Sequence, residues 1–289
     1  LIRSPMISQA ALVVGHADTS LNTELDVISE LSKAAGAIGR THGVLLMVEL
    51  GDLREGIMPV DLERVVGRTL RFPNIAFKGI GTNLACRSGV VPDSANMGEL
   101  SKLANALDAT FGPIVSMVSG GNSSNLNWVL GGADTGRINN LRLGESILLG
   151  CETLHRQPIE GLHTDAFTLV AEVIESGPKP TKPWGEIAEN AFGAVVTPVD
   201  SGTICQAILA LGQMDTDPDG LTPPPGIRIL GSSSDHLVVD YGRECLPTGT
   251  EITFQLNYSA VARAMTSPFV TKQIEPRKEP EMQSMERAV

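Results

Sequence analysis

The chain has 289 residues, of which 42% are hydrophobic, and its formal net charge at pH 7 is −11. A chain of this length can bury one large core or two ordinary ones without help from disulfides or metals. The acidic balance excludes nucleic acid and anionic membranes as main partners, because both would repel the protein. An anionic ligand therefore needs a local site.

Strand and helix patterns alternate over the first half of the chain. Extended runs are expected at 1–4, 17–21, 43–50, 75–81, 113–118 and 137–145. Helical runs follow them at 6–16, 24–39, 58–72, 94–110, after the serines near 123, and at 145–154. Six strands, each followed by a helix, predict an α/β domain with a parallel sheet.

The pattern changes near residue 157. Short β-like segments separated by glycine and proline are expected at 166–175, 193–200, 204–212, 226–241 and 250–260. They predict a mainly antiparallel second domain. The charged stretch 273–289 has no apolar period, so we expect a disordered tail there.

Cysteine spacing and hydropathy bear on the compartment. Cys86, Cys151, Cys205 and Cys245 lie far apart and include no Cys-x-x-Cys pair. This spacing suggests neither a structural zinc nor a disulfide framework, and we expect a reduced, cytoplasmic protein. No apolar run in the sequence approaches the roughly 18 residues of a membrane span.

Polar clusters follow four successive strands of the first domain. They read ELGDLREG at 49–56, GIGTNLACRSG at 79–89, SGGNSS at 119–124 and LRLGE at 141–145. Parallel α/β domains carry their chemistry at the carboxyl ends of the strands. The SGGNSS cluster offers backbone N–H groups and hydroxyls just before a helix, which predicts an anion site, whereas solvated turns are the alternative.

Arg142 follows a strand in an apolar setting, where a guanidinium needs an acceptor or a ligand. A ligand would satisfy it, and so would a buried ion pair with Glu145 or Asp52. The pattern alone leaves both interpretations open. A dinucleotide site is not expected, because GIGTNLACRSG lacks the third glycine of that fingerprint.

A metal-dependent hydrolase is one alternative for the chemistry. Two short runs contain His163, Asp165, Asp235, His236 and Asp240. Barrel hydrolases usually pair two histidines as His-x-His, and none of the five histidines does so. A serine hydrolase is not expected either, because the chain has no G-x-S-x-G motif.

Seven motifs occur in the order LIRSPM, ELGDLREG, GIGTNLAC, SGGNSS, INNLRLGESILLG, SSSDHLVVD and MTSPFV. With them, the sequence resembles the pyridoxal-phosphate (PLP) dependent alanine/ornithine racemase family over residues 1–272. The resemblance implies a TIM-type (β/α)8 barrel at 1–157, with about six of its eight βα units present, and a mainly β domain at 158–272. It also implies a homodimer with shared active sites that racemises a small amino acid such as ornithine or alanine.

The resemblance further implies how the cofactor is held. Its phosphate is expected at Ser119, Gly120, Gly121, Asn122 and Ser123, and at the N–H groups of Gly144 and Glu145. Arg142 is expected to face the pyridine nitrogen, Asn83 to stack on the ring, and Arg54 to support the cofactor or the substrate carboxylate. Because arginine keeps its proton, it leaves that nitrogen unprotonated, which favours racemisation over transamination.

Racemisation needs two bases, one on each face of Cα. The family's tyrosine base has no matching motif here, so Asp235 and His236 are the candidates for the β domain, and a hydrogen-bonded loop corner is the alternative. An imidazole suits this task near neutral pH.

The family's cofactor lysine also has no matching context among Lys33, Lys78, Lys102, Lys179, Lys182 and Lys272. We therefore expect a fragment of a complete racemase or, as the alternative, a lysine-less relative that binds PLP or another protein without catalysis. The 289 residues alone are expected neither to close a barrel nor to hold PLP covalently.

Overall fold

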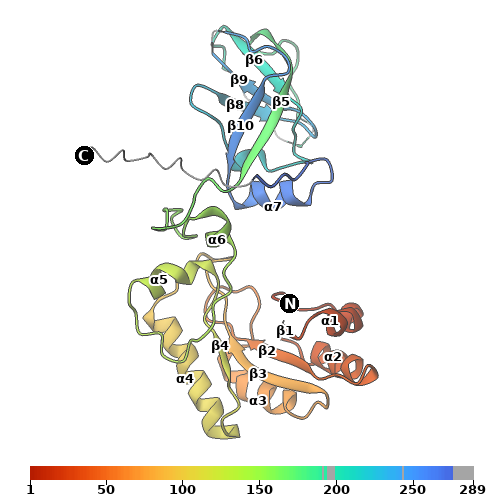
Figure 1. The fold of residues 1–289 in the computed structure, drawn as a ribbon, viewed down its shortest axis with the longest axis vertical. Helices are drawn as coiled ribbons and strands as arrows, with labels where there is room; N and C mark the ends of the chain where they lie inside the picture. Colours follow the sequence, from red (N-terminus) through yellow and green to blue (C-terminus); the bar gives the residue numbers. More distant parts are fainter. Residues whose placement is uncertain (191, 194–198, 243, 276–289) are drawn as a thin grey trace, which may run out of the picture. The chain divides into compact units, whose positions relative to one another are not determined.

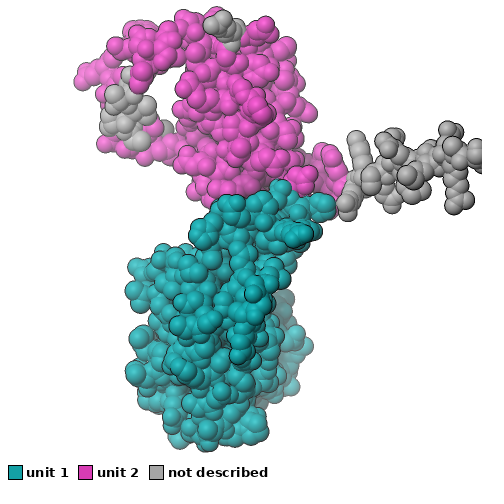
Figure 2. All heavy atoms as spheres, turned by 90° about the vertical axis from the view of Figure 1, so that its left-hand side faces the viewer, with its two compact units in different colours: residues 1–164 teal, residues 165–289 magenta. Residues whose placement is uncertain are grey.

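The computed structural model describes residues 1–190, 192–193, 199–242 and 244–275. The chain divides into two compact units, Leu1–Thr164 and Asp165–Val289, shown in teal and magenta in Figure 2. The first unit extends past the boundary expected at residue 157. The expected disordered tail falls mostly on 276–289, outside the described residues.

Unit 1 is built on a parallel sheet (Figure 1). Its order is β1 (Thr19–Asn22), β2 (His42–Met47), β3 (Ile75–Gly81) and β4 (Met117–Ser119). The helical segments of the unit are η1 (Ile7–Gln9), α1 (Ala10–His16), α2 (Leu25–Ala37), α3 (Pro59–Thr69), α4 (Ser94–Phe111), η2 (Ser123–Asn125), α5 (Leu126–Leu130) and α6 (Glu145–Leu149). This alternation of parallel strands and helices confirms the α/β class.

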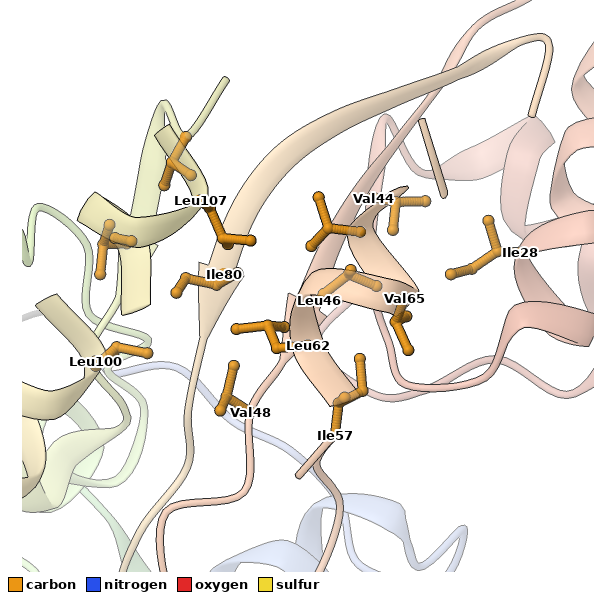
Figure 3. Close-up of a cluster of buried hydrophobic side chains, with 14 residues drawn as sticks. Ile28, Val44, Leu46, Val48, Ile57, Leu62, Val65, Ile80, Leu100 and Leu107 are labelled. Carbon is orange, nitrogen blue, oxygen red and sulfur yellow. The ribbon is translucent and has the colours of Figure 1, made fainter. Parts of the chain in front are cut away.

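The core of unit 1 explains why these segments form. All six residues of β2 are buried, and Figure 3 shows Val44 and Leu46 from this strand packed among helix side chains. Ile28 of α2, Leu62 of α3 and Leu100 of α4 belong to the same cluster and are at most 1% exposed. Each such side chain contributes about 1.5–3 kcal/mol when it leaves water. The apolar face of each helix therefore fixes that helix against the sheet.

Two of the six expected strands do not form regular ladders, so that part of the prediction is wrong in detail. In the segment 1–4, only Leu1 bonds to β1, through Leu21 N–H to Leu1 O at 3.1 Å and its own amine to Thr19 O at 2.7 Å. The segment 137–145 forms a single bridge, Ser119 to Asn140. Before this bridge, the Val118 N–H donates to the side-chain Oδ1 of Asn139, at 2.9 Å, and not to a backbone carbonyl, so the ladder does not extend in that direction.

Gly79 and Gly81 allow close backbone packing between β3 and β4. A Cβ on Gly79 would lie 1.9 Å from Met117 O in the neighbouring strand, and one on Gly81 would lie 3.0 Å from the Ser119 Cβ. The pair therefore lets β3 and β4 approach at the edge of the sheet where their loops carry the polar clusters.

Unit 2 contains a six-stranded antiparallel sheet of order β7-β10-β5-β6-β9-β8. The elements are β5 (Thr168–Pro180), β6 (Thr203–Leu209), η3 (Pro218–Gly220), β7 (Leu221–Thr222), β8 (Arg228–Ser232), β9 (Leu237–Asp240), β10 (Glu251–Leu256) and α7 (Tyr258–Thr266). Alternate residues of β5 and β10 are buried around Phe254, as expected for a sheet with one covered face. The predicted β domain is confirmed; the strand expected at 193–200 lies mostly outside the described residues.

The expectation of no disulfide is wrong. Cys205 and Cys245 form one, with their Cα atoms 5.0 Å apart across a sequence separation of 40 residues. Pairing of β6 with β9 brings them together, since Tyr241 N–H donates to Cys205 O at 3.0 Å. Motif spacing does not reveal such a contact because it arises from strand pairing. Cys86 and Cys151 are free thiols.

His42 gives unit 1 a pH-dependent stability. It is 2% exposed at the start of β2, and its Nε2 lies 2.8 Å from Ser20 Oγ. Burial lowers the pKa of the His42 imidazole, so the unfolded chain binds the proton more readily. The resulting stabilisation is complete above pH ~6.5 and is lost as the pH falls toward the folded-state pKa.

We therefore expect the free energy of unfolding of the wild type, measured in urea, to fall below pH ~6.5. His42→Gln should partly remove this fall. His16→Gln is the matched control, because His16 is exposed on α1. Identical pH profiles for wild type and His42→Gln would contradict the assignment.

Candidate functional site

The candidate site lies where β3 and β4 end side by side. Thr82 N–H donates to Ser119 O at 2.9 Å, so the loops after both strands begin next to each other. The segment after residue 140 joins them, since Arg142 N–H donates to Gly121 O at 2.9 Å. Three polar clusters that are distant in sequence therefore meet at one edge of the sheet.

A backbone cup forms at Gly121, Asn122 and Ser123. Asn122 Oδ1 accepts from Ser124 N–H at 2.8 Å, while its Nδ2 donates to Asn83 Oδ1 at 3.0 Å and to Leu84 O at 2.9 Å. Within the part of the chain that the structure describes, the N–H groups of residues 121–123 donate no hydrogen bond. Three consecutive free donors at the start of a helical turn suit an anion.

Gly121 shapes the floor of this cup. Its φ is 147°, a conformation that favours glycine, and a Cβ there would lie 2.1 Å from Asn125 Oδ1. Asn125 is fully buried and donates from Nδ2 to Gly120 O at 3.1 Å. The asparagine side chain thus fills the space under the glycine.

Ser123 links the cup to the start of α6. Its Oγ lies within hydrogen-bond reach of Gly144 N at 3.3 Å and of Ser146 N and Oγ at 3.2 and 3.1 Å. The Glu145 N–H donates no hydrogen bond to any described residue. Ser146, which is fully buried, was missed from the sequence, although a serine in the first turn of a helix was the available signal.

Among the described residues, only uncharged oxygens accept hydrogen bonds from the Arg142 side chain. Its guanidinium donates to Ser119 Oγ at 2.6 Å, to Thr82 O at 2.8 Å and to Asn83 Oδ1 at 3.2 Å. Ser119 Oγ in turn bonds Asn140 Oδ1 at 2.7 Å, a second residue that sequence reasoning missed. The side chain is therefore fixed on three sides.

Neither of the two expected ion pairs of Arg142 forms. Asp52, 1% exposed, accepts instead from the backbone N–H groups of residues 86–88 and so anchors the loop after β3. Glu145 pairs with Arg156. Burial lowers the pKa of Arg142, Glu55 and Cys86 raise it, and Arg54 lowers it. Arg142 nevertheless stays a cation, since guanidinium does not lose its proton in proteins.

Asn83 carries an unsatisfied buried donor. It is 8% exposed, and its Oδ1 accepts from both Arg142 and Asn122. Its Nδ2 has no hydrogen-bond partner among the described residues. Leaving this donor unsatisfied costs about 1–3 kcal/mol, so a ligand that offers it an acceptor would be bound more tightly.

Three predicted site residues make hydrogen bonds or ion pairs with their own chain neighbours. Arg54, in the loop after β2, is 45% exposed and pairs with Glu55. Asp235 and His236 belong to unit 2, between β8 and β9, where Asp235 Oδ1 lies 2.8 Å from His236 Nδ1 and both side chains are exposed. No group of three potential metal ligands occurs among the described residues.

The lysines of unit 1 do not reach the cup. Lys33 and Lys102 form exposed ion pairs with Glu30 and Glu99 on their own helices. Lys78 is exposed in the middle of β3, three residues before its end. No helix in the described residues is long and apolar enough to cross a lipid bilayer.

Comparisons with known proteins agree with this geometry. The sequence model of the family described as "Alanine racemase, N-terminal domain" matches residues 1–151. The ornithine racemase of Acetoanaerobium sticklandii is 41% identical over 278 residues, which cover 95% of this chain and 79% of that protein. The lysine racemase of Thermotoga maritima is 35% identical over 280 residues, covering 96% of this chain and 78% of that protein.

A solved alanine racemase from Streptomyces coelicolor A3(2) has the same fold, with a TM-score of 0.61 at 19% identity; the match covers 84% of this chain and 64% of that one. The family match, the sequence identities and the fold all indicate the same family. The chain belongs to the alanine racemase family of PLP-dependent amino-acid racemases.

Proposed function

We propose that the protein racemises a dibasic amino acid, ornithine or lysine, with PLP held at the ends of β3 and β4. The names of its two relatives support this substrate class. The net charge of −11 permits a cationic substrate but does not select one. We further propose a homodimer with shared active sites.

The cup fits the phosphate end of the cofactor. The free N–H groups of Gly121, Asn122 and Ser123 would donate to phosphate oxygens, together with that of Glu145. The Gly144 N–H, which lies 3.3 Å from Ser123 Oγ, would be shared with this hydroxyl. Gly120 and Ser119 position the strand end beneath them. Backbone donors of this kind hold an anion even in an acidic protein because they act at close range.

The ring end would lie against Asn83 and Arg142. Bound PLP supplies an electron sink that acidifies the proton on the substrate's Cα. Arg142, fixed by Ser119, Thr82 and Asn83, would face the pyridine nitrogen as a permanent donor and keep that nitrogen unprotonated. The free Nδ2 of Asn83 would find its missing acceptor on the ligand.

Proton transfer at Cα needs groups on both faces. We assign one of these groups to His236, whose imidazole Asp235 would orient through the 2.8 Å contact. We expect the partner protomer to contribute both residues to the active site. Arg54 would receive the substrate carboxylate as a guanidinium fork.

The observation that carries the proposal is the partly buried guanidinium of Arg142, bound by three oxygens and by no carboxylate of the described residues. Chiral chromatography of L-ornithine, L-lysine and L-alanine incubated in D2O with PLP and the complete racemase, which supplies the cofactor lysine that no lysine of this sequence matches, tests it. We expect D-ornithine or D-lysine carrying deuterium at Cα. Binding of PLP without isomerisation or deuterium exchange of any of the three would favour the non-catalytic alternative instead.

A further inference from the structure

Glu55 holds the guanidinium of Arg54 by one edge. Arg54 Nε donates to Glu55 Oε2, and Arg54 NH2 donates to Glu55 Oε1 at 2.6 Å. The two residues are neighbours in the chain, so the pair is local and does not depend on a distant element. Two parallel hydrogen bonds fix the plane of a guanidinium, which a single contact does not.

The opposite edge of Arg54 is left open. A guanidinium has five N–H donors in a rigid fork, and Glu55 uses the Nε–NH2 edge. Among the described residues, NH1 of Arg54 makes no hydrogen bond. The NH1–NH2 edge is therefore available for a second carboxylate.

An open pocket of about 300 Å³ adjoins this pair. Arg54 and Glu55 line it together with Ile2, Arg3 and Ser4. The Ser4 Oγ is buried and has no hydrogen-bond partner among the described residues. A pocket of this size is at the lower end of those that hold small ligands.

The charges of this pair also act on the ring-end arginine, Arg142. The Glu55 hydrogen bond raises the pKa of Arg54, against burial, and Glu55 also raises the pKa of Arg142 while Arg54 lowers it. Glu55 thus opposes the effect of Arg54 on the pKa of Arg142. Because both side chains of the pair are partly exposed, this charge effect is screened and small compared with orientation.

We propose that Glu55 is a positioning residue, which holds Arg54 by its Nε edge so that its outer edge receives the α-carboxylate of the amino-acid substrate in this pocket. The inference rests on the proposed racemase function for the identity of the substrate. It predicts a loss of carboxylate recognition rather than a loss of folding or of chemistry when Glu55 is replaced.

Binding measurements on the full chain test this without turnover. Calorimetry with L-ornithine and with putrescine, which lacks the carboxylate, gives the preference of each variant for a carboxylate. Glu55→Gln should reduce that preference about tenfold, because it breaks the bidentate grip. Arg54→Lys, which keeps the charge without the fork, should do the same, and the double variant should lose little more.

Glu63→Gln is the matched control, since Glu63 is exposed on α3 away from this loop. In steady-state assays, Glu55→Gln should raise KM for ornithine about tenfold with a smaller change in kcat. An unchanged preference in Glu55→Gln, a lowered KM, or fully additive effects of the two substitutions would overturn the positioning role. A wild type that prefers ornithine to putrescine but does not racemise it would overturn the proposed function alone.

Discussion

Replacing Arg142 by glutamate should lower kcat/KM for racemisation by about 10²- to 10³-fold and raise the rate of 2-oxo acid formation. A carboxylate at this position would stabilise a proton on the pyridine nitrogen, whereas arginine opposes it. The change also removes the donors to Thr82 O and Asn83 Oδ1 and brings an anion beside them. Chiral chromatography and a coupled dehydrogenase assay for the oxo acid measure the two rates.

Two variants separate chemistry from structure. Arg142→Lys keeps the charge but loses the fork that reaches Ser119, Thr82 and Asn83, so it should slow racemisation without promoting oxo acid formation. Arg71→Glu makes the same charge change at an exposed position and should leave both rates unaltered. Wild-type kinetics in Arg142→Glu would remove this residue from the ring.

Much of the fold could be predicted because its signals are local. The buried run of β2 and the apolar faces of α2, α3 and α4 follow directly from residue type and spacing. The exceptions depend on contacts between residues that are distant in the sequence. Asn139 captures the Val118 N–H and ends a ladder, and Cys205 meets Cys245 through strand pairing. Composition and periodicity do not contain that information.

The candidate site was likewise predicted only in part from the sequence. Its backbone cup was visible as a glycine-rich, serine-rich strand end. The partners of Arg142 were not, because the sequence offered two acids nearby and the structure uses neither. Asp52 instead binds the backbone of the loop after β3. Neutral oxygens hold Arg142 without a direct ion pair, which is the property the proposed chemistry needs.

Gly121→Ala should abolish high-affinity PLP binding and lower the free energy of unfolding by about 2–3 kcal/mol. The new methyl group would lie 2.1 Å from Asn125 Oδ1 in a backbone conformation with φ of 147°. Asn125 cannot easily give way, since it is fully buried and bonded to Gly120 O. The backbone must therefore shift, and the N–H groups of residues 121–123 would shift with it.

Gly15→Ala is the matched control for this substitution. Gly15 lies in α1 and outside the cup, its φ is not in the left-handed region, and a methyl group added there would have no neighbouring atom within 4 Å. Its unfolding free energy should not fall, because alanine favours a helix over glycine, and PLP affinity should be retained. Equilibrium dialysis with PLP and urea unfolding measure both quantities. If Gly121→Ala bound PLP like Gly15→Ala, the phosphate would have to lie elsewhere than at the ends of β3 and β4.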